Sequence, residues 1–416
     1  MVSHSKLLRR NRRFRRLWLA RVVSFLGDAM GDVAFILYVA EEMDSAMAVA
    51  LLLVAGGFIP TLLSPFIGVV ADRLERRRLL IICELGQALA IGAFVIFEPP
   101  LGVLLVLVAI GGLFANLFQA AARSAVPDLV ADEDLEHANA LIGGGTYGLE
   151  AIGPLLAAVL LPFMSPRGVL AIDAVTFLVS PLLLAGLPRM RSAFRSGKDE
   201  TVSAAARIGI RYIWSHQLLR PVAVAFVVVV AFNGVDDLAL VFLGRDIFAA
   251  SDSGISLLYA ASGLGILLGF ALVVSRTTRV PPVTIAIAGF AIGSAGNLLT
   301  GLSPVIAAAF AMQMVRGVGI SLMEVGPTTL VQRTVPRHLR GRVFANLYGA
   351  IGLAAGFSYL VGGPLMDRLS PRTVLVIAGA GGLATSAILA LRLLTPTGRA
   401  RASASDDRPD DEIGDP

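Results

Sequence analysis

Residues 68–78 read GVVADRLERRR, a short charged stretch between two long apolar runs. It holds four arginines and two carboxylates within eleven residues. On its own it permits three interpretations: a solvated loop, a nucleic-acid-binding patch, or a functional part of the molecule. The sequence on either side decides between them.

The composition of the chain indicates that lipid is its main solvent. Of 416 residues, 56% are hydrophobic and 16% are charged, and the mean hydropathy is +0.77. Soluble domains carry roughly a quarter charged residues. The pI of about 9.8 would suggest nucleic acid as a partner of a soluble protein. Here the basic residues lie between apolar segments, so membrane topology explains them and no nucleic-acid partner is expected.

The apolar runs predict an all-α membrane protein of twelve transmembrane helices. A helix that spans a bilayer needs about 20 mostly apolar residues. The segments that qualify are 17–40, 46–70, 79–98, 101–122, 138–162, 168–187, 220–243, 253–275, 282–302, 305–329, 343–366 and 373–394.

The distribution of Lys and Arg predicts the orientation in the membrane. With the N-terminus inside, 30 of the 35 basic residues fall in or beside inner connections, and only four fall in outer ones. Because cytoplasmic loops carry the excess of Lys and Arg, we expect both termini in the cytoplasm. The expected location of the protein is a bacterial inner membrane.

The chain also predicts two pseudo-symmetric halves of six helices each. Val-Pro, a polar connection and Ala-Asn recur in the same order within 125–141 and within 334–349. Such repeats are typical of secondary transporters. The expected domains are a basic cytoplasmic arm (1–16), two halves (17–187 and 220–394), a cytoplasmic connection (188–219) and a disordered tail (395–416).

Several function classes lack support in the sequence. The four histidines have no ligand-like spacing, so no metal site is expected. No phosphate-binding G-x-x-x-x-G-K-[ST] motif occurs, and no nucleophile–base pair or cofactor motif stands out. We therefore expect neither a cofactor nor enzymatic activity. The Gly-rich stretches 143–145 and 263–269 are interpreted as close helix packing.

Two aspartates inside the first predicted span are the strongest functional signal. Asp28 and Asp32 are four residues apart, so both can face one cavity. Each costs about 2.5–3.5 kcal/mol to insert, which means that they face protein or water. Two such carboxylates repel each other, and at least one is expected to bind and release a proton. The alternatives are that one caps a broken turn or pairs with Arg21.

Other ionisable residues also lie at membrane depth. Arg316 should pair with a carboxylate or await an anionic group on a substrate. Glu84 lies near the inner end of its helix, where it can snorkel, and Asp173 is expected to make a structural hydrogen bond. The remaining candidates for a proton-coupling or substrate cavity are Glu150, Asp236, Asp237 and Glu324.

With twelve spans and GVVADRLERRR after the second, the chain resembles the major facilitator superfamily. The family signature between helices 2 and 3 is G-x-x-x-D-[RK]-x-G-R-[RK], and Glu75 stands at its second glycine. Segments 11–30, 171–187 and 330–345 resemble the bacterial drug-efflux branch that includes macrolide and enterobactin exporters. The residues that match the signature are Gly68, Asp72, Arg73, Arg76 and Arg77.

The resemblance implies a central cavity lined by helices 1, 4, 7 and 10, which adds Asn116 and Gln119 to the candidates. Gly153 and Pro154 are similar to one end of the family's antiporter motif. The resemblance also implies that Asp72 contacts helix 11, beginning near Arg340, and holds the cytoplasmic side shut.

The residues of this stretch are chemically suited to form such a gate on the cytoplasmic side. Gly68 permits close approach of another helix, and Asp72 can accept hydrogen bonds from a helix N-terminus. Arg73, Arg76 and Arg77 can pair with carboxylates such as Asp128, or they only set the topology.

The sequence favours a secondary active exporter of a small amphipathic molecule, driven by proton antiport. Its expected partners are that substrate, protons and membrane lipid, and we expect a monomer. A facilitator or importer of a polar solute is the second interpretation. A membrane scaffold or sensor without transport activity is the third, although no large partner-binding region is visible.

Overall fold

The computed structural model describes residues 7–63, 74–190, 202–276 and 280–394, and every regular element in these ranges is helical. The helices are α2 (Arg12–Met43), α3 (Ala46–Leu53), the π-helix η1 (Val54–Phe58), α5 (Arg76–Phe97), α6 (Leu101–Leu129), the 3-10 helix η2 (Asp132–Asp134), α7 (Leu135–Leu160), α8 (Pro166–Leu184), α9 (Val202–Ser215), α10 (Leu219–Asn233), α11 (Asp236–Phe242), the π-helix η3 (Leu243–Ile247), α12 (Asp252–Arg276), α13 (Pro282–Leu302), α14 (Ile306–Thr334), α15 (Arg340–Met366) and α16 (Pro371–Leu394).

Local chemistry fixes where several helices begin. The Glu75 side chain accepts a hydrogen bond from the Arg77 backbone N–H and caps α5. Ser165 caps α8 through the Gly168 N–H, and Pro166 occupies the first helical position, where no N–H is needed. Within lipid, helices satisfy their own backbone groups, which explains the all-helical architecture.

Eleven helices of the described ranges are long and apolar enough to cross a membrane. Nine predicted spans match one helix each, and 220–243 matches the rod of α10, α11 and η3 over Leu219–Ile247. The span 46–70 matches the helical run Ala46–Leu63, which includes α3 and η1, and its residues 64–70 lie outside the described ranges. The segment 138–162 lies in α7, where only the shorter Ala151–Leu160 qualifies as an apolar helix. The chain is a multi-pass membrane protein, and its twelfth span stays a prediction.

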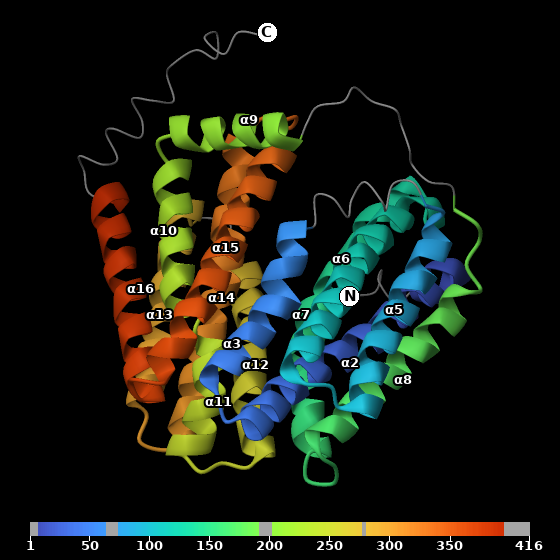
Figure 1. Ribbon diagram of the computed structural model, residues 1–416. Coiled ribbons are helices and arrows are strands. Elements are labelled where there is room, and N and C mark those ends of the chain that lie inside the picture. Colours follow the sequence, from blue (N-terminus) through green and yellow to red (C-terminus); the bar gives the residue numbers. More distant parts are fainter. Residues whose placement is uncertain (1–6, 64–73, 191–201, 277–279, 395–416) are drawn as a thin grey trace.

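The helices form two groups that lie side by side (Figure 1). Helices α2 to α8 make the N-terminal group, and α10 to α16 make the C-terminal group. The groups meet where α15 packs against α3 and η1, and where α12 packs against α7. Helix α9 lies across one end of the molecule and packs on α15, where Asn346 Nδ2 donates to the Ala206 carbonyl. We call this end the α9 end, and the other the Asp44 end.

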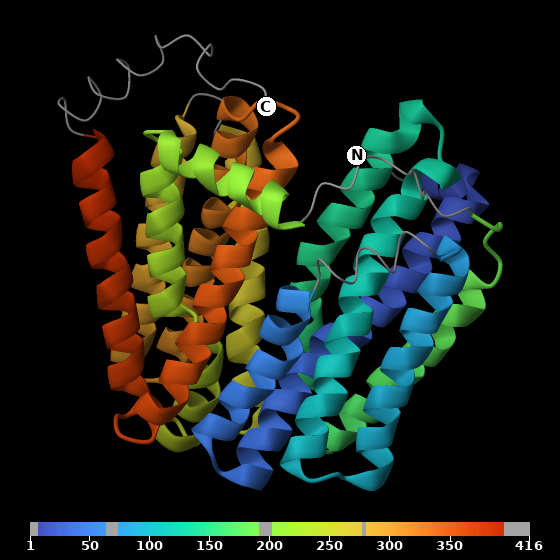
Figure 2. The ribbon, with the colours of Figure 1, turned by 45° about the horizontal axis from the view of Figure 1, so that its top comes forward.

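Within the described residues, the apolar core that combines both groups lies toward the Asp44 end. Toward the Asp44 end, one core cluster combines residues of both groups, such as Leu37 and Val49 with Leu238 and Phe242. Toward the α9 end, one cluster belongs to the N-terminal group alone and another to the C-terminal group alone. Figure 2 shows the groups converging at the Asp44 end and diverging toward α9. Among the described residues, the cavity between the groups is therefore closed on the Asp44 side.

Candidate functional site

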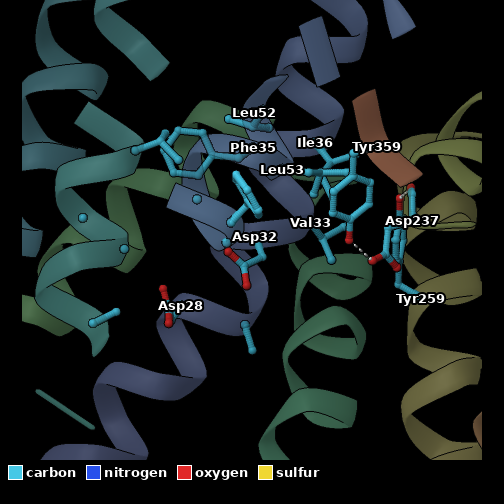
Figure 3. A pocket seen from close by; sticks show the side chains of 18 of the residues that line it. Asp28, Asp32, Val33, Phe35, Ile36, Leu52, Leu53, Asp237, Tyr259 and Tyr359 are labelled. Carbon is cyan, nitrogen blue, oxygen red and sulfur yellow. Dashed lines mark hydrogen bonds between the residues drawn. The ribbon is translucent and has the colours of Figure 1, made fainter. Parts of the chain in front are cut away.

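A cavity of about 650 Å3 lies between the two groups of helices. Its wall is mainly apolar, with side chains such as Phe35, Leu52 and Val108. Figure 3 shows part of this wall and its polar groups. The ionisable residues among those that line it, tyrosines aside, are Asp28, Asp32, Asp237 and Arg316.

Asp28 and Asp32 both line the cavity from α2, as their spacing predicts. They stand one helical turn apart, so their side chains leave the same face of the helix. Asp32 is exposed to the cavity space, and Asp28 is partly exposed. The cavity therefore presents two α2 carboxylates within a mainly apolar wall.

Asp173 of α8 lies directly behind these two aspartates. It is 1% exposed and packs against α2 where Gly31 leaves room: a Cβ at Gly31 would lie 2.5 Å from Asp173 Oδ2. Thr176 Oγ1 donates to the Asp173 carbonyl at 2.8 Å and lies 3.4 Å from its Oδ1. This agrees with the expected structural hydrogen bond.

Glu84 of α5 corrects one prediction. Its place near the inner end of the helix suggested that it can snorkel toward water, but its exposed fraction is 0%. Its carboxylate lies beside the hydroxyl groups of Ser24 in α2 and Ser180 in α8, within reach of the charge of Asp28. Snorkelling was the wrong expectation because Glu84 points toward α2 and α8 and away from the surface of the bundle, a direction that an all-apolar run does not reveal.

On the C-terminal side, Arg316 of α14 forms an ion pair with Asp236 of α11. It also donates from Nη1 to Ser262 Oγ at 2.9 Å. The side chains of Asp236 and Arg316 are 2% and 14% exposed, so the pair is nearly shielded from solvent. The expectation that Arg316 pairs with a carboxylate is met, and Arg316 still forms part of the cavity wall.

Asp237 lies next to this pair and is held by two tyrosines. Tyr359 Oη donates to Asp237 Oδ2 at 3.1 Å, and the Tyr259 hydroxyl donates to the Asp237 carbonyl. Asp236 and Asp237 form the first turn of α11, where free backbone N–H groups favour negative charge. Neither Tyr259 nor Tyr359 was predicted, because tyrosines in apolar runs carry no periodic signal.

Three further candidates do not line the cavity, and the side chain of a fourth is not described. Asn116 and Gln119 belong to α6, but the α6 part of the wall ends at Ala115. Glu324 of α14 accepts a hydrogen bond from Tyr348 Oη of α15 at 2.8 Å and does not line the cavity. Glu150 belongs to α7, and its side chain lies outside the described part of the structure.

Helix α7 packs against both α2 and α12, and Gly153 lies at its contact with α2. A Cβ at Gly153 would lie 2.7 Å from the Ala29 carbonyl carbon, so only glycine permits this approach to α2. Pro154 lies within α7 and lines the cavity. The antiporter-like segment therefore borders the cavity close to the α2 aspartates.

The predicted gate is described only in part. Gly68, Asp72 and Arg73 lie outside the described residues, so the contact of Asp72 with helix 11 and the pairing of Arg73 with a carboxylate stay predictions. Arg76 forms the expected ion pair with Asp128, and Arg77 Nη1 donates to the Leu187 carbonyl at 3.0 Å.

Glu75 stands at the signature's second glycine and joins two segments of the N-terminal group. Its Oε1 accepts hydrogen bonds from the backbone N–H groups of Arg77 and Met190. Helix α15 begins at Arg340, where helix 11 was expected to begin. Within the described ranges, no group of three or more metal-ligating side chains occurs.

Comparison with known proteins identifies the family. The model of the Major Facilitator Superfamily matches residues 17–348. The multidrug efflux pump Tap of Mycolicibacterium fortuitum is 26% identical over 367 residues, 84% of this chain and 88% of Tap. Macrolide efflux protein A of Streptococcus pyogenes is 27% identical over 183 residues, 42% of this chain and 44% of that protein.

The solved structure of the nucleoside transporter NupG superimposes with a TM-score of 0.70 at 12% identity, and it covers 91% of this chain and 98% of NupG. At that identity the likeness concerns the fold. The chain belongs to the Major Facilitator Superfamily of membrane transporters, and its relatives include proteins of the drug-efflux branch.

Proposed function

We propose that this protein is a secondary active exporter that moves a small amphipathic compound out of the bacterial cytoplasm in exchange for protons. The observation that carries the proposal is the cavity itself. Its wall is mainly apolar, which suits a lipophilic cargo, and Asp28 and Asp32 stand within it one turn apart.

The two aspartates supply the exchange. Negative charge on a carboxylate is costly within a mainly apolar cavity, so binding of either a proton or a cationic group of the cargo is favoured there. Release of one then favours binding of the other. Moving one charge across the membrane potential releases about 2.3 kcal/mol per 100 mV, so the entry of one proton can drive export of the cargo.

The arrangement of the two groups supports alternating access. The described apolar cores of the two groups are joined at the Asp44 end and are separate toward the α9 end. We place the α9 end on the cytoplasmic side of the inner membrane. In this state cargo enters from the cytoplasm. Rocking of one group against the other then exposes the cavity to the outside.

Everted membrane vesicles test this function with ethidium, a lipophilic cation, as the probe. We expect that an imposed pH gradient, acid inside, drives ethidium into vesicles that contain the protein. Asp28→Asn should reduce this uptake at least tenfold, because a neutral amide at this position cannot bind or release a proton.

The matched control is Asp132→Asn, an exposed aspartate in η2 that should keep wild-type uptake. Uptake by Asp28→Asn at the wild-type rate would refute the role of Asp28. Movement of ethidium only down its own gradient would instead favour a facilitator.

A further inference from the structure

Glu84 is a carboxylate at membrane depth that takes no part in lining the cavity. It is fully buried, and neither of its carboxylate oxygens has a hydrogen-bond partner in the described part of the structure. The hydroxyl groups of Ser24 and Ser180 lie beside it. Ser180 is also fully buried, and its Oγ lacks a partner as well. These buried oxygen atoms therefore form a small polar cluster in the packed interior between α2, α5 and α8.

Such an environment suits a neutral carboxylic acid. No ion pair reaches Glu84 within the described ranges, and an unpaired buried charge costs several kcal/mol. A protonated carboxyl can donate to a serine hydroxyl and satisfy both groups. The charged side chains that interact within this region are Arg21, Asp28 and Asp32 on α2, Arg123 on α6 and Asp173 on α8. The other charged residues of these helices include Arg12, Arg13, Arg15, Arg16, Glu41 and Glu42 on α2, Asp128 on α6 and Arg167 on α8.

Three of the interacting neighbours are carboxylates. A negative charge on Glu84 would therefore be repelled by any ionised carboxylate on α2 or α8. Glu84 interacts electrostatically with Asp28, and Asp173 interacts electrostatically with Asp28, Asp32 and Glu84. These carboxyl groups therefore form one cluster in which ionisation of one disfavours ionisation of the next. Only its α2 members line the cavity.

We infer that Glu84 is a second proton-binding site of the transport cycle, placed behind the cavity wall and connected to it through Asp28. The inference rests on the proposed proton antiport. The proton leaves the carboxyl oxygen of Asp28 and binds a carboxyl oxygen of Glu84, directly or through the Ser24 hydroxyl. Asp28 is then an anion that can bind a cationic cargo, and Glu84 is neutral, so total charge is conserved.

This placement separates the cargo from the stored proton. Cargo in the cavity touches Asp28 and Asp32, but it cannot touch Glu84, which has no exposed surface. Glu84 should therefore affect coupling and not cargo binding. A purely structural glutamate would instead affect stability and leave the coupling intact.

Two assays on purified protein in liposomes distinguish these roles, with ethidium as the probe. The first measures ethidium accumulation driven by a pH gradient, and the second measures exchange of labelled for unlabelled ethidium at equal pH. Glu84→Gln preserves the size and hydrogen-bonding capacity of the protonated acid but cannot release a proton. We expect at least a tenfold loss of gradient-driven accumulation, with exchange within twofold of wild type.

The matched control is Glu98→Gln, at the other end of α5, which should keep both activities. Wild-type accumulation by Glu84→Gln would overturn the inference, as would loss of both activities in a variant with wild-type thermal stability. If Glu84→Gln does not fold, Glu84→Asp is used. The inference then requires a shifted pH dependence of accumulation, and an unchanged profile overturns it.

The two proposals fail in different ways. Wild-type protein without gradient-driven accumulation would contradict proton antiport itself. Wild-type protein that couples normally, together with a Glu84→Gln variant that also couples normally, would contradict only the role of Glu84.

Discussion

At the scale of single residues, the two walls of the cavity differ in charge. On the C-terminal wall, the positive charge of Arg316 is already balanced by Asp236, and the carboxylate of Asp237 accepts a hydrogen bond from Tyr359. The N-terminal wall presents Asp28 and Asp32, with Asp173 behind them. A cargo with a cationic group therefore fits the N-terminal wall, whereas an anionic cargo would have to displace Asp236 from Arg316.

The Arg316–Asp236 pair leads to a prediction about stability. Asp236→Ala leaves a buried guanidinium without its partner, and loss of one partner of a buried pair costs about 3–5 kcal/mol. We expect a lower thermal unfolding temperature in detergent for Asp236→Ala. The double variant Asp236→Ala with Arg316→Met should recover part of the loss, because no unpaired charge remains. Equal unfolding temperatures for wild type and Asp236→Ala would contradict a stabilising pair.

Residue types and spacing predicted part of this site. Asp28 and Asp32 share a face because i and i+4 residues of a helix always do. The direction of Glu84, Asn116 and Gln119 could not be predicted, since a membrane helix that is apolar on all sides has no hydrophobic period to orient it. Which side chain meets the cavity then depends on contacts between helices.

At the scale of helices, α7 is confined between two neighbours. Gly153 contacts α2 at Ala29, and Gly263 of α12 contacts α7 at Ala151. Both contacts lie beside the cavity, so the spacing of these helices determines its width. Small residues at helix interfaces let backbones approach in this way.

We therefore predict that Gly153→Val lowers stability and transport. Its Cβ would lie 2.7 Å from the backbone carbon of Ala29, so α7 must shift away from α2. Thermal unfolding and ethidium uptake measure the two effects. Gly92→Val in α5 is the control, because a Cβ there meets nothing within 4 Å. If both valine variants behaved like wild type, the close α2–α7 contact would not be needed.

The lengths of the apolar runs predicted most transmembrane helices, but they did not predict two features of the structure. The seventh span is broken at Gly234–Val235, between the end of α10 and the start of α11. Hydropathy does not reveal such a break, because α10 and α11 are both mainly apolar. Helix α9 lies in the connection 188–219, for which no helix was predicted. It is too short and too polar to count as a span, so a search for apolar runs passed over it.

At the scale of the whole molecule, one ion pair links the two groups at the Asp44 end. Arg245 Nη2 lies 2.6 Å from Asp44 Oδ1, and Nη1 donates to the Ala40 carbonyl. The guanidinium also stacks over Phe242 at 5.0 Å from the ring centroid. Because Asp44 follows α2 and Arg245 belongs to η3, these contacts favour the state that is closed at this end.

Arg245→Gln should therefore shift the population toward a state open at the Asp44 end. The chain's single cysteine, Cys83, is buried, so a cysteine introduced at the cavity residue Leu53 can be labelled selectively. We expect Arg245→Gln to accelerate labelling of Leu53→Cys by a membrane-impermeant thiol reagent added from the Asp44 side. Arg167→Gln is the control, since its ion pair with Glu98 stays within one group. Equal acceleration by both variants would contradict a specific role of the Arg245 contact.

The central claim is that cargo and protons move in opposite directions through one cavity. The most direct test loads liposomes that contain the purified protein with a pH-sensitive dye, clamps the membrane potential and imposes an inward ethidium gradient without a pH gradient. We predict that entering ethidium drives protons out, so the lumen becomes alkaline, and that Asp28→Asn abolishes this change. Entry of ethidium through the wild-type protein with no change in luminal pH would contradict proton antiport.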